Sequence, residues 1–254
     1  MGKFKKIFII FLLILVTAGC IALGIKSRYD ARLKIDTIKN LNDEVVGYGI
    51  KTSLDNLVLI DGGSNLNKET ILNYINANGG TVEYWFVTNM ENNKFGALNE
   101  ILEENSSLVN NIIVSQNSDD WYRENSDAEY TLVYNFLNNL RKEEVMDKVQ
   151  NATLRQVFKL DNLKIEVLKI AGIENREELI HSQTMVLKID NMFKSAMFLN
   201  RLPVSLEKDF INNNLDKLDS DVLCSYRENI GDELKTNISP EVILDKSEST
   251  LEIW

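Results

Sequence analysis

The chain has 254 residues, of which 44% are hydrophobic and 26% are charged, and this composition is ordinary for one globular domain with an additional segment. Its net charge at pH 7 is −10, but residues 1–40 hold eight basic and two acidic side chains, so this part carries +6 and the rest carries −16. A body this acidic repels a phosphate backbone, which excludes general nucleic-acid binding.

The N-terminal segment has the pattern of a membrane anchor. Residues 7–25 contain no charged side chain, and three lysines precede them. As a helix, this run is about 28 Å long, close to the thickness of a bilayer core. We expect a transmembrane signal anchor at 7–25, a cytoplasmic tail at 1–6 and a body outside the cytoplasm, because a short tail rich in lysine is hard to translocate. The alternative is a lipoprotein signal cleaved before Cys20.

Residues 26–42 follow the predicted anchor and are rich in charge. Leu33, Ile35 and Ile38 are scattered along this segment. We interpret it as a juxtamembrane stalk with helical structure, so that the folded domain extends over 43–254.

The body alternates between strand and helix patterns. The first half predicts, in order, a buried strand at 56–63 ending in Asp-Gly-Gly, a helix at 67–80 stopping at two glycines, a strand at 81–89, a helix at 95–104, a strand at 110–116 and a long amphipathic helix at 128–145. The second half predicts hairpins at 155–170 and 184–200, a helix at 205–215, and strands at 220–226 and 241–245. This order favours sheets covered by helices on their outer faces.

Several fragments of the body resemble one known superfamily. Leu-Ile-Asp-Gly-Gly at 59–63, followed by the strand and helix over 82–104, resembles the metallo-β-lactamase superfamily, and most of all the hydrolase domain of competence-type DNA-uptake channel proteins. Further fragments at 45–50, 159–170, 181–190, 196–203 and 220–229 follow in the same order as in that branch. The resemblance covers about residues 44–245 and implies an α/β (α+β) fold, a four-layer αββα sandwich.

The positions that correspond to the metal ligands of this superfamily have changed. Thr88 and Gly96 keep the frame of the histidine-rich motif, but the four ligand positions hold Asn89, Glu91, Asn93 and Lys94. The bridging aspartate corresponds to Arg201, and a downstream pair of histidines corresponds to Arg227 and Glu228. Zinc requires converging anionic or imidazole ligands, and of these replacements only Glu91 is a good one. We therefore expect zinc to be absent.

Two interpretations of these substitutions remain open. In the first, Lys94, Arg201 and Arg227 place positive charge where metals sit in the superfamily, pair with Glu91 and Glu228, and form an ionic pocket for an anionic small ligand. In the second, they are solvated loop residues.

Two further residues are candidates for the same pocket. His181, the only histidine, corresponds to a position near the rim, and one imidazole without a partner does little chemistry. Asp61 is expected to cap its own turn.

The sequence therefore favours a membrane-anchored, extracytoplasmic pseudoenzyme that binds or scaffolds an envelope partner or an anionic small ligand, without a cofactor. The alternative is a divergent hydrolase, acting on phosphoesters or similar substrates, that is metal-free or holds a hard cation at Glu91. A third possibility, an accessory factor of an export or DNA-uptake system, rests on analogy alone.

Overall fold

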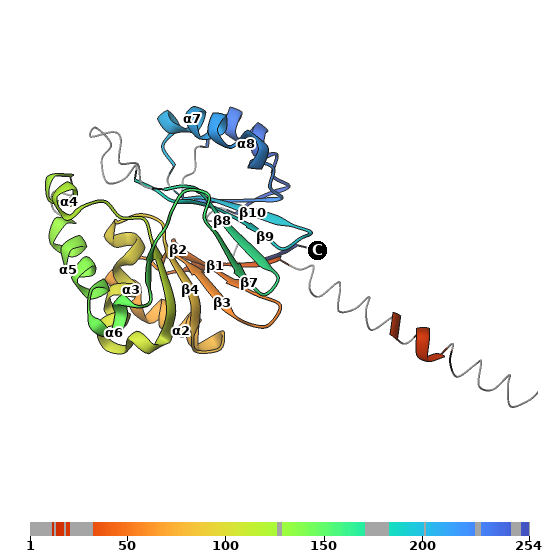
Figure 1. The fold of residues 1–254 in the computed structure, drawn as a ribbon, viewed down its shortest axis with the longest axis horizontal. Coiled ribbons are helices and arrows are strands. Elements are labelled where there is room, and N and C mark those ends of the chain that lie inside the picture. The colour runs from red at the N-terminus through yellow and green to blue at the C-terminus, as the bar shows by residue number, and fades with distance from the viewer. Residues whose placement is uncertain are drawn as a thin grey trace, which may run out of the picture.

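Two β-sheets packed face to face form the centre of the computed structural model, and helices lie on both outer sides (Figure 1). The structure describes residues 12, 14–17, 19–20, 33–125, 129–170, 183–200, 202–226, 230–244 and 250–253.

Each of the two sheets combines parallel and antiparallel strands. The first is built from β1 (Leu33–Lys39), β2 (Val45–Lys51), β3 (Leu57–Ile60), β4 (Val82–Val87), β5 (Val109–Val114), β6 (Val149–Asn151) and β13 (Thr250–Ile253), in the order β13-β1-β2-β3-β4-β5-β6. The second is built from β7 (Val157–Leu160), β8 (Leu163–Lys169), β9 (Val186–Asp190), β10 (Ser195–Asn200), β11 (Val222–Ser225) and β12 (Val242–Leu244), in the order β12-β11-β10-β9-β8-β7. Strands β3 to β6 are mutually parallel, as are β10 to β12.

The helices connect these strands on the outside. They are α2 (Lys68–Ala77), α3 (Asn92–Asn105), α4 (Asp119–Asn125), α5 (Tyr130–Leu140), α6 (Glu143–Met146), α7 (Val204–Asn214) and α8 (Asp232–Ile238), with short 3₁₀ turns η1 (Asn65–Asn67), η2 (Ser106–Leu108) and η5 (Leu215–Lys217). The predicted strands and hairpins and the helices near 67–80, 95–104 and 205–215 are confirmed.

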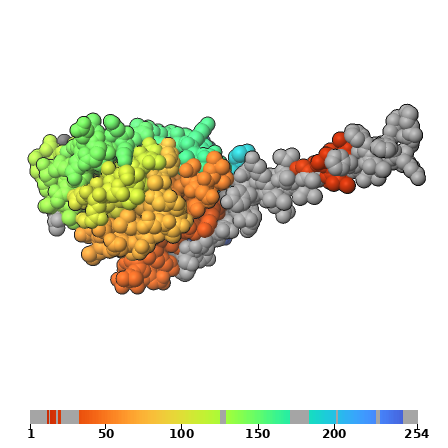
Figure 2. Space-filling model, turned by 90° about the horizontal axis from the view of Figure 1, so that it is seen from below, coloured from red at the N-terminus to blue at the C-terminus, as the bar shows by residue number. Residues whose placement is uncertain are grey.

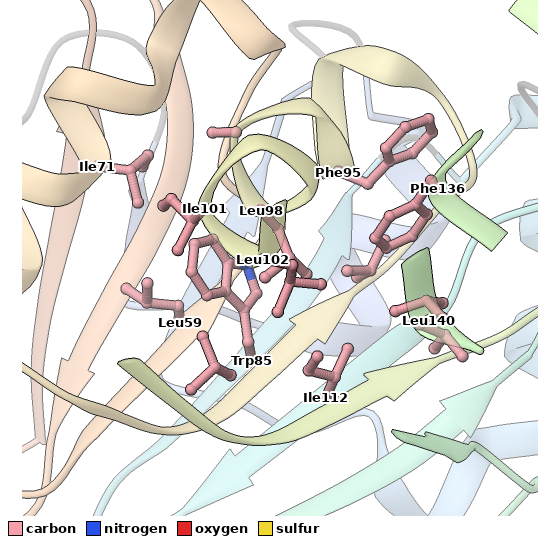
Figure 3. Packing of buried hydrophobic residues seen from close by; sticks show 14 of the residues in the cluster. Leu59, Ile71, Trp85, Phe95, Leu98, Ile101, Leu102, Ile112, Phe136 and Leu140 are labelled. Carbon is pink, nitrogen blue, oxygen red and sulfur yellow. The ribbon is translucent and has the colours of Figure 1, made fainter. Parts of the chain in front are cut away.

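Three separate hydrophobic clusters show that the molecule has four layers. Side chains alternate along a strand, so Leu57 and Leu59 of β3 face the helices while Val58 and Ile60 face the second sheet. The cluster under α2, α3 and α5 includes Trp85, close to Leu59 and Leu98 in Figure 3. A second cluster lies between the sheets, and a third lies under α7 and α8. This is the predicted order of helices, sheet, sheet and helices.

The prediction of a helical stalk at 26–42 is wrong over Leu33–Lys39, which forms β1. This strand pairs with β2 on one side and β13 on the other, and its Leu33 and Ile35 are fully buried between the sheets. Burial of alternate residues is the pattern of a strand. The folded domain therefore includes residues that precede the predicted boundary at 43.

The predicted long helix at 128–145 is also wrong in one respect, because it is two helices within the described part. Helix α5 ends at Leu140, and α6 begins at Glu143. Lys142 between them has an extended backbone, with φ of −61° and ψ of 144°, which interrupts the helical hydrogen bonds.

Among the described residues, no helix is both long and apolar enough to span a membrane. Most of the predicted anchor at 7–25 lies outside the described residues.

Candidate functional site

The ends of several strands meet at one edge of the two sheets. Because β3 and β4 are parallel, Asp61 and Thr88 follow them at the same edge. The backbone oxygen of Thr88 accepts a hydrogen bond of 2.7 Å from the Met185 N–H, which joins the first sheet to the second. The Asn200 side chain then donates to the Met185 oxygen at 2.7 Å, and the Tyr226 N–H donates to the Asn200 oxygen at 3.2 Å. We call this edge the cleft end.

Asp61 is the most deeply buried charged group of this edge, with no exposed surface. Its carboxylate accepts hydrogen bonds from the Thr88 backbone N–H at 2.8 Å and from the Thr88 hydroxyl at 2.8–2.9 Å. The expectation that Asp61 caps its own turn is therefore wrong, because its side chain bonds to the end of the neighbouring strand. Burial raises the pKa of Asp61, while Lys94, Thr88 and Tyr226 lower it.

Lys94 supplies the cation that faces this carboxylate. It lies in the first turn of α3, where Gly96 lets the helix approach η1 so closely that a Cβ there would stand 2.3 Å from the Asn65 nitrogen. The Lys94 ammonium is buried, 3.6 Å from a carboxylate oxygen of Asp61 and 3.0 Å from the centre of the Tyr226 ring. An aromatic face attracts a cation, and more so when both are shielded from water. Asp61, Lys94 and Tyr226 form a cluster that we call the ionic core.

The Tyr226 phenol stays neutral at physiological pH. Burial raises the pKa of Tyr226, and the nearby Asp61 carboxylate raises it further. The neighbouring Tyr226 phenol in turn lowers the pKa of Asp61. The ionic core therefore contains one ammonium, one carboxyl and one neutral phenol.

A cleft of about 620 Å³ opens over the ionic core. Its walls come from residues within 40–46, 63–70, 93–94 and 225–226, and Lys94 and Tyr226 are among them. Besides Lys94, Glu44 is the charged residue of the described lining, and most of the others carry amide, hydroxyl or aliphatic groups. Leu41 and Leu66 of this lining are exposed at 102% and 88%. The described lining has no surplus of positive charge.

The residues predicted from the metal-binding motif lie together at the cleft end. Asn89, Glu91 and Lys94 are all less than 5% exposed, so the interpretation of solvated loop residues is wrong for Glu91 and Lys94. Asn93 is exposed and lines the cleft. Arg201, Arg227, Glu228 and His181 lie outside the described residues.

Glu91 has a structural position that the motif did not indicate. It precedes α3 with an extended backbone, and its carbonyl oxygen accepts a hydrogen bond of 2.9 Å from the Lys94 N–H. The predicted pairing joined Lys94, Arg201 and Arg227, as a group, to Glu91 and Glu228. The structure places the Lys94 ammonium beside Asp61, which that pairing did not include.

The described part of this site does not fit zinc. It contains no group of three or more His, Cys, Asp or Glu side chains placed to hold a metal ion. Asn89 and Asn93 present neutral amides, and Lys94 presents a positive donor. A zinc site instead needs deprotonated nitrogen, oxygen or sulfur ligands that converge within about 2.0–2.3 Å.

Sequence reasoning missed the roles of Thr88 and Tyr226. The motif includes Thr88 only as part of its frame, and it does not include Tyr226. One available signal was position, because each directly follows an apolar strand, where side chains emerge at the carboxyl edge of a sheet. The burial of Lys94 had no local signal.

Comparison with known proteins bears on the fold alone. No protein-family model and no curated protein sequence matches the chain. The solved structure of the metallo-β-lactamase fold protein YhfI from Bacillus subtilis is similar, with 11% identity, 84% of this chain and 85% of that chain covered, and a TM-score of 0.52. A metallo-β-lactamase with an HARLDQ motif from Cronobacter sakazakii has 15% identity, coverage of 74% and 76%, and a TM-score of 0.50. Together with the two-sheet architecture, these similarities show that the chain has a metallo-β-lactamase fold.

Proposed function

We propose that this chain is a non-catalytic, membrane-anchored binding or scaffolding protein built on a metallo-β-lactamase fold. The observation that carries the proposal is the ionic core, in which Lys94 presents its ammonium to the buried Asp61 carboxylate. An ammonium tethered to the backbone supplies the positive charge that the carboxylate needs. A divalent cation approaching Asp61 would meet this like charge in a region where water screens little.

The energetics of the ionic core support a structural role for its charges. If Lys94 turned away before a metal bound, Asp61 would stay buried without a cation, and breaking a buried pair typically costs about 3–5 kcal/mol. The ammonium would also lose the face of the Tyr226 ring. Both losses favour retention of Lys94.

The proposed ligand occupies the cleft, as an envelope partner or an anionic small molecule. The charge of Lys94 is already matched by Asp61, so an anion would depend on the side chains of Arg201 and Arg227. An accessory role in DNA uptake or export is a further form of the proposed binding. It rests on the resemblance to the competence-type branch alone.

The proposed location rests on the sequence of the N-terminal segment. Its 19 uncharged residues, with Lys3, Lys5 and Lys6 before them, suit a single anchor with the body outside the cytoplasm. Protease treatment of intact cells and of lysed cells tests this orientation. Full protection in intact cells would contradict it.

Metal analysis of the purified full chain tests the absence of zinc chemistry. We expect metal well below one equivalent, no change in melting temperature with a chelator, and no turnover of phosphoesters or β-lactams. A Lys94→Ala variant measured in parallel shows whether removal of the ammonium admits a metal. Stoichiometric metal in the parent protein, with melting that depends on the chelator, would favour the divergent hydrolase instead.

A further inference from the structure

The end of the molecule opposite the cleft receives the chain from the N-terminal segment. Leu33 begins β1 there, paired with Ile253 of β13, and Lys34 lies opposite Lys51 at the end of β2. The turn between β2 and β3 lies at this end, because Lys51 at the end of β2 pairs with Leu57 at the start of β3. The turn between β7 and β8 is bonded to it, so β8 begins at this end. Asp190 at the end of β9 pairs with Lys164 at the start of β8, which places the turn between β9 and β10 here as well. We call this end of the molecule the tether end.

Two turns of the tether end are tied together across the sheets. In the β2–β3 turn, Thr52 bonds to Asp161, and the Ser53 N–H donates to the Asn162 side chain at 2.9 Å. Asp161 and Asn162 form the β7–β8 turn of the second sheet. Figure 1 shows the β9–β10 turn on the same side as the C-terminus, and Figure 2 shows cyan atoms, the colour of β9 and β10, at the surface there. The end is therefore a fixed surface with parts from both sheets.

Three apolar side chains project from this surface. Leu54 of the β2–β3 turn is 72% exposed, and Met192 and Phe193 of the β9–β10 turn are 90% and 57% exposed. Met192 has a φ of 76°, a conformation that glycine or asparagine adopts more easily. Such a position, occupied by a large apolar side chain, indicates a use for that side chain in contact with something outside the domain.

The β9–β10 turn also keeps charge away from its tip. The Asn191 side chain accepts hydrogen bonds from the Phe193 N–H at 3.2 Å and the Lys194 N–H at 2.9 Å, which holds the turn in shape. The Lys194 ammonium points back to Asp221 at 2.9 Å and Glu241 at 3.1 Å. Met192 and Phe193 are thus presented on an ordered, uncharged tip.

The connection between the predicted anchor and Leu33 is short, and this limits how far the tip can lie from the membrane. Only residues 26–32 separate the predicted anchor at 7–25 from β1. Even fully extended, a connection of this length spans at most about 28 Å. The tether end therefore stays close to the bilayer, while the cleft end lies a further seven residues of β1 away, about 23 Å.

We propose that the tether end rests on the lipid bilayer, with Leu54, Met192 and Phe193 in the interfacial region and the cleft directed into the water phase. This inference rests on the proposed membrane anchor. Apolar side chains are stabilised when they enter the interfacial region of a bilayer. Membrane attachment becomes more stable when two attachments act together, here the anchor and the apolar tip. The contact fixes the height and direction of the cleft above the membrane.

Fluorescence of the full chain in lipid vesicles tests the orientation. A tryptophan at the tip, Phe193→Trp, and one at the cleft rim, Leu41→Trp, are each compared with the parent, which has Trp85, Trp121 and Trp254. With brominated phosphatidylcholine, we expect strong quenching of the added fluorescence for Phe193→Trp and little for Leu41→Trp. Equal quenching of both, quenching of Leu41→Trp alone, or quenching of neither would overturn the proposal.

Trypsin cleavage provides a second measurement. The residues before β1 contain Lys26, Arg28 and Arg32, which docking would shield from the protease. We expect Phe193→Asp to speed cleavage there about tenfold in vesicles, the ratio expected for a change of about 1.4 kcal/mol, and Leu41→Asp to leave it unchanged. Equal rates for the two variants would refute docking. Flotation separates this result from loss of the anchor, because a chain that fails to float with the vesicles contradicts the proposed anchor rather than the proposed orientation.

Discussion

Replacement of Lys94 by methionine tests the ionic core directly. Methionine keeps much of the length and apolar stem of lysine but removes the charge, so Asp61 is left buried with its two hydrogen bonds from Thr88. Loss of one partner of a buried pair costs about 3–5 kcal/mol, and the Thr88 bonds place our expectation near 3 kcal/mol. For a chain of this size, that loss corresponds to a fall in melting temperature of about 6–12 °C.

Urea denaturation of the parent and the Lys94→Met variant measures this loss. Lys68→Met is the matched control, because its ammonium lies 2.7 Å from Glu104, closer than Lys94 lies to Asp61, but on the surface. If distance decided the energy, Lys68 would matter more. We expect the opposite order, with a nearly unchanged urea midpoint for Lys68→Met, because water screens an exposed pair.

The pH dependence of the Lys94→Met variant provides an independent check. Burial raises the pKa of Asp61, and Lys94 is the strongest of the contacts that lower it, so the variant raises this pKa further. A carboxyl whose pKa is higher in the folded than in the unfolded protein takes up protons on folding, so stability increases as the pH falls through the folded pKa towards the unfolded value. The difference between variant and parent is therefore largest near neutral pH and shrinks on acidification.

The single variants Asp61→Asn and Lys94→Met and the double variant that combines them form a double-mutant cycle. The double variant has no uncompensated charge, so we expect it to be more stable than Lys94→Met alone, with a coupling of about 1–3 kcal/mol. An unchanged urea midpoint for Lys94→Met, a loss that does not vary with pH, or strict additivity in the cycle would refute the ionic core.

Three further experiments test other parts of the structure. Thr88→Val removes the hydroxyl that donates to Asp61 and is expected to cost about 1.5–3 kcal/mol by urea denaturation, whereas Thr88→Ser should retain most of this stability. Ile35→Ala is expected to cost about 2–5 kcal/mol because Ile35 is buried in β1, while Lys34→Ala should change stability by less than about 0.5 kcal/mol, and equal small effects would favour a stalk over a strand. Burial raises the pKa of the Cys224 thiol, so in a Cys20→Ser background we expect maleimide to label Cys224 only as fast as the protein unfolds, and rapid labelling of the folded protein would contradict its position between the sheets.

Much of the fold was predictable because its signals are local. One pair of glycines, Gly79 and Gly80, predicts the end of the helix α2, and the turn at Asp161 predicts the first hairpin. The order of strands and helices then suggested two sheets with helices outside, and the superfamily resemblance named the sandwich. These features depend on residues that are neighbours in the chain, so periodicity and turn residues reveal them.

The sequence by itself predicted most strands of the body, several of its helices and, through the resemblance, the changed ligand positions, and it contains the uncharged run of the proposed anchor. Only the tertiary structure decided that Leu33–Lys39 is a strand, because its partner β13 lies at the other end of the chain. It also decided that Lys94 is buried beside Asp61, 33 positions earlier. The local sequence does not distinguish a buried lysine in a polar segment from a solvated one. Its burial depends on which strand ends meet at the edge of the sheets, and this is a property of the whole fold.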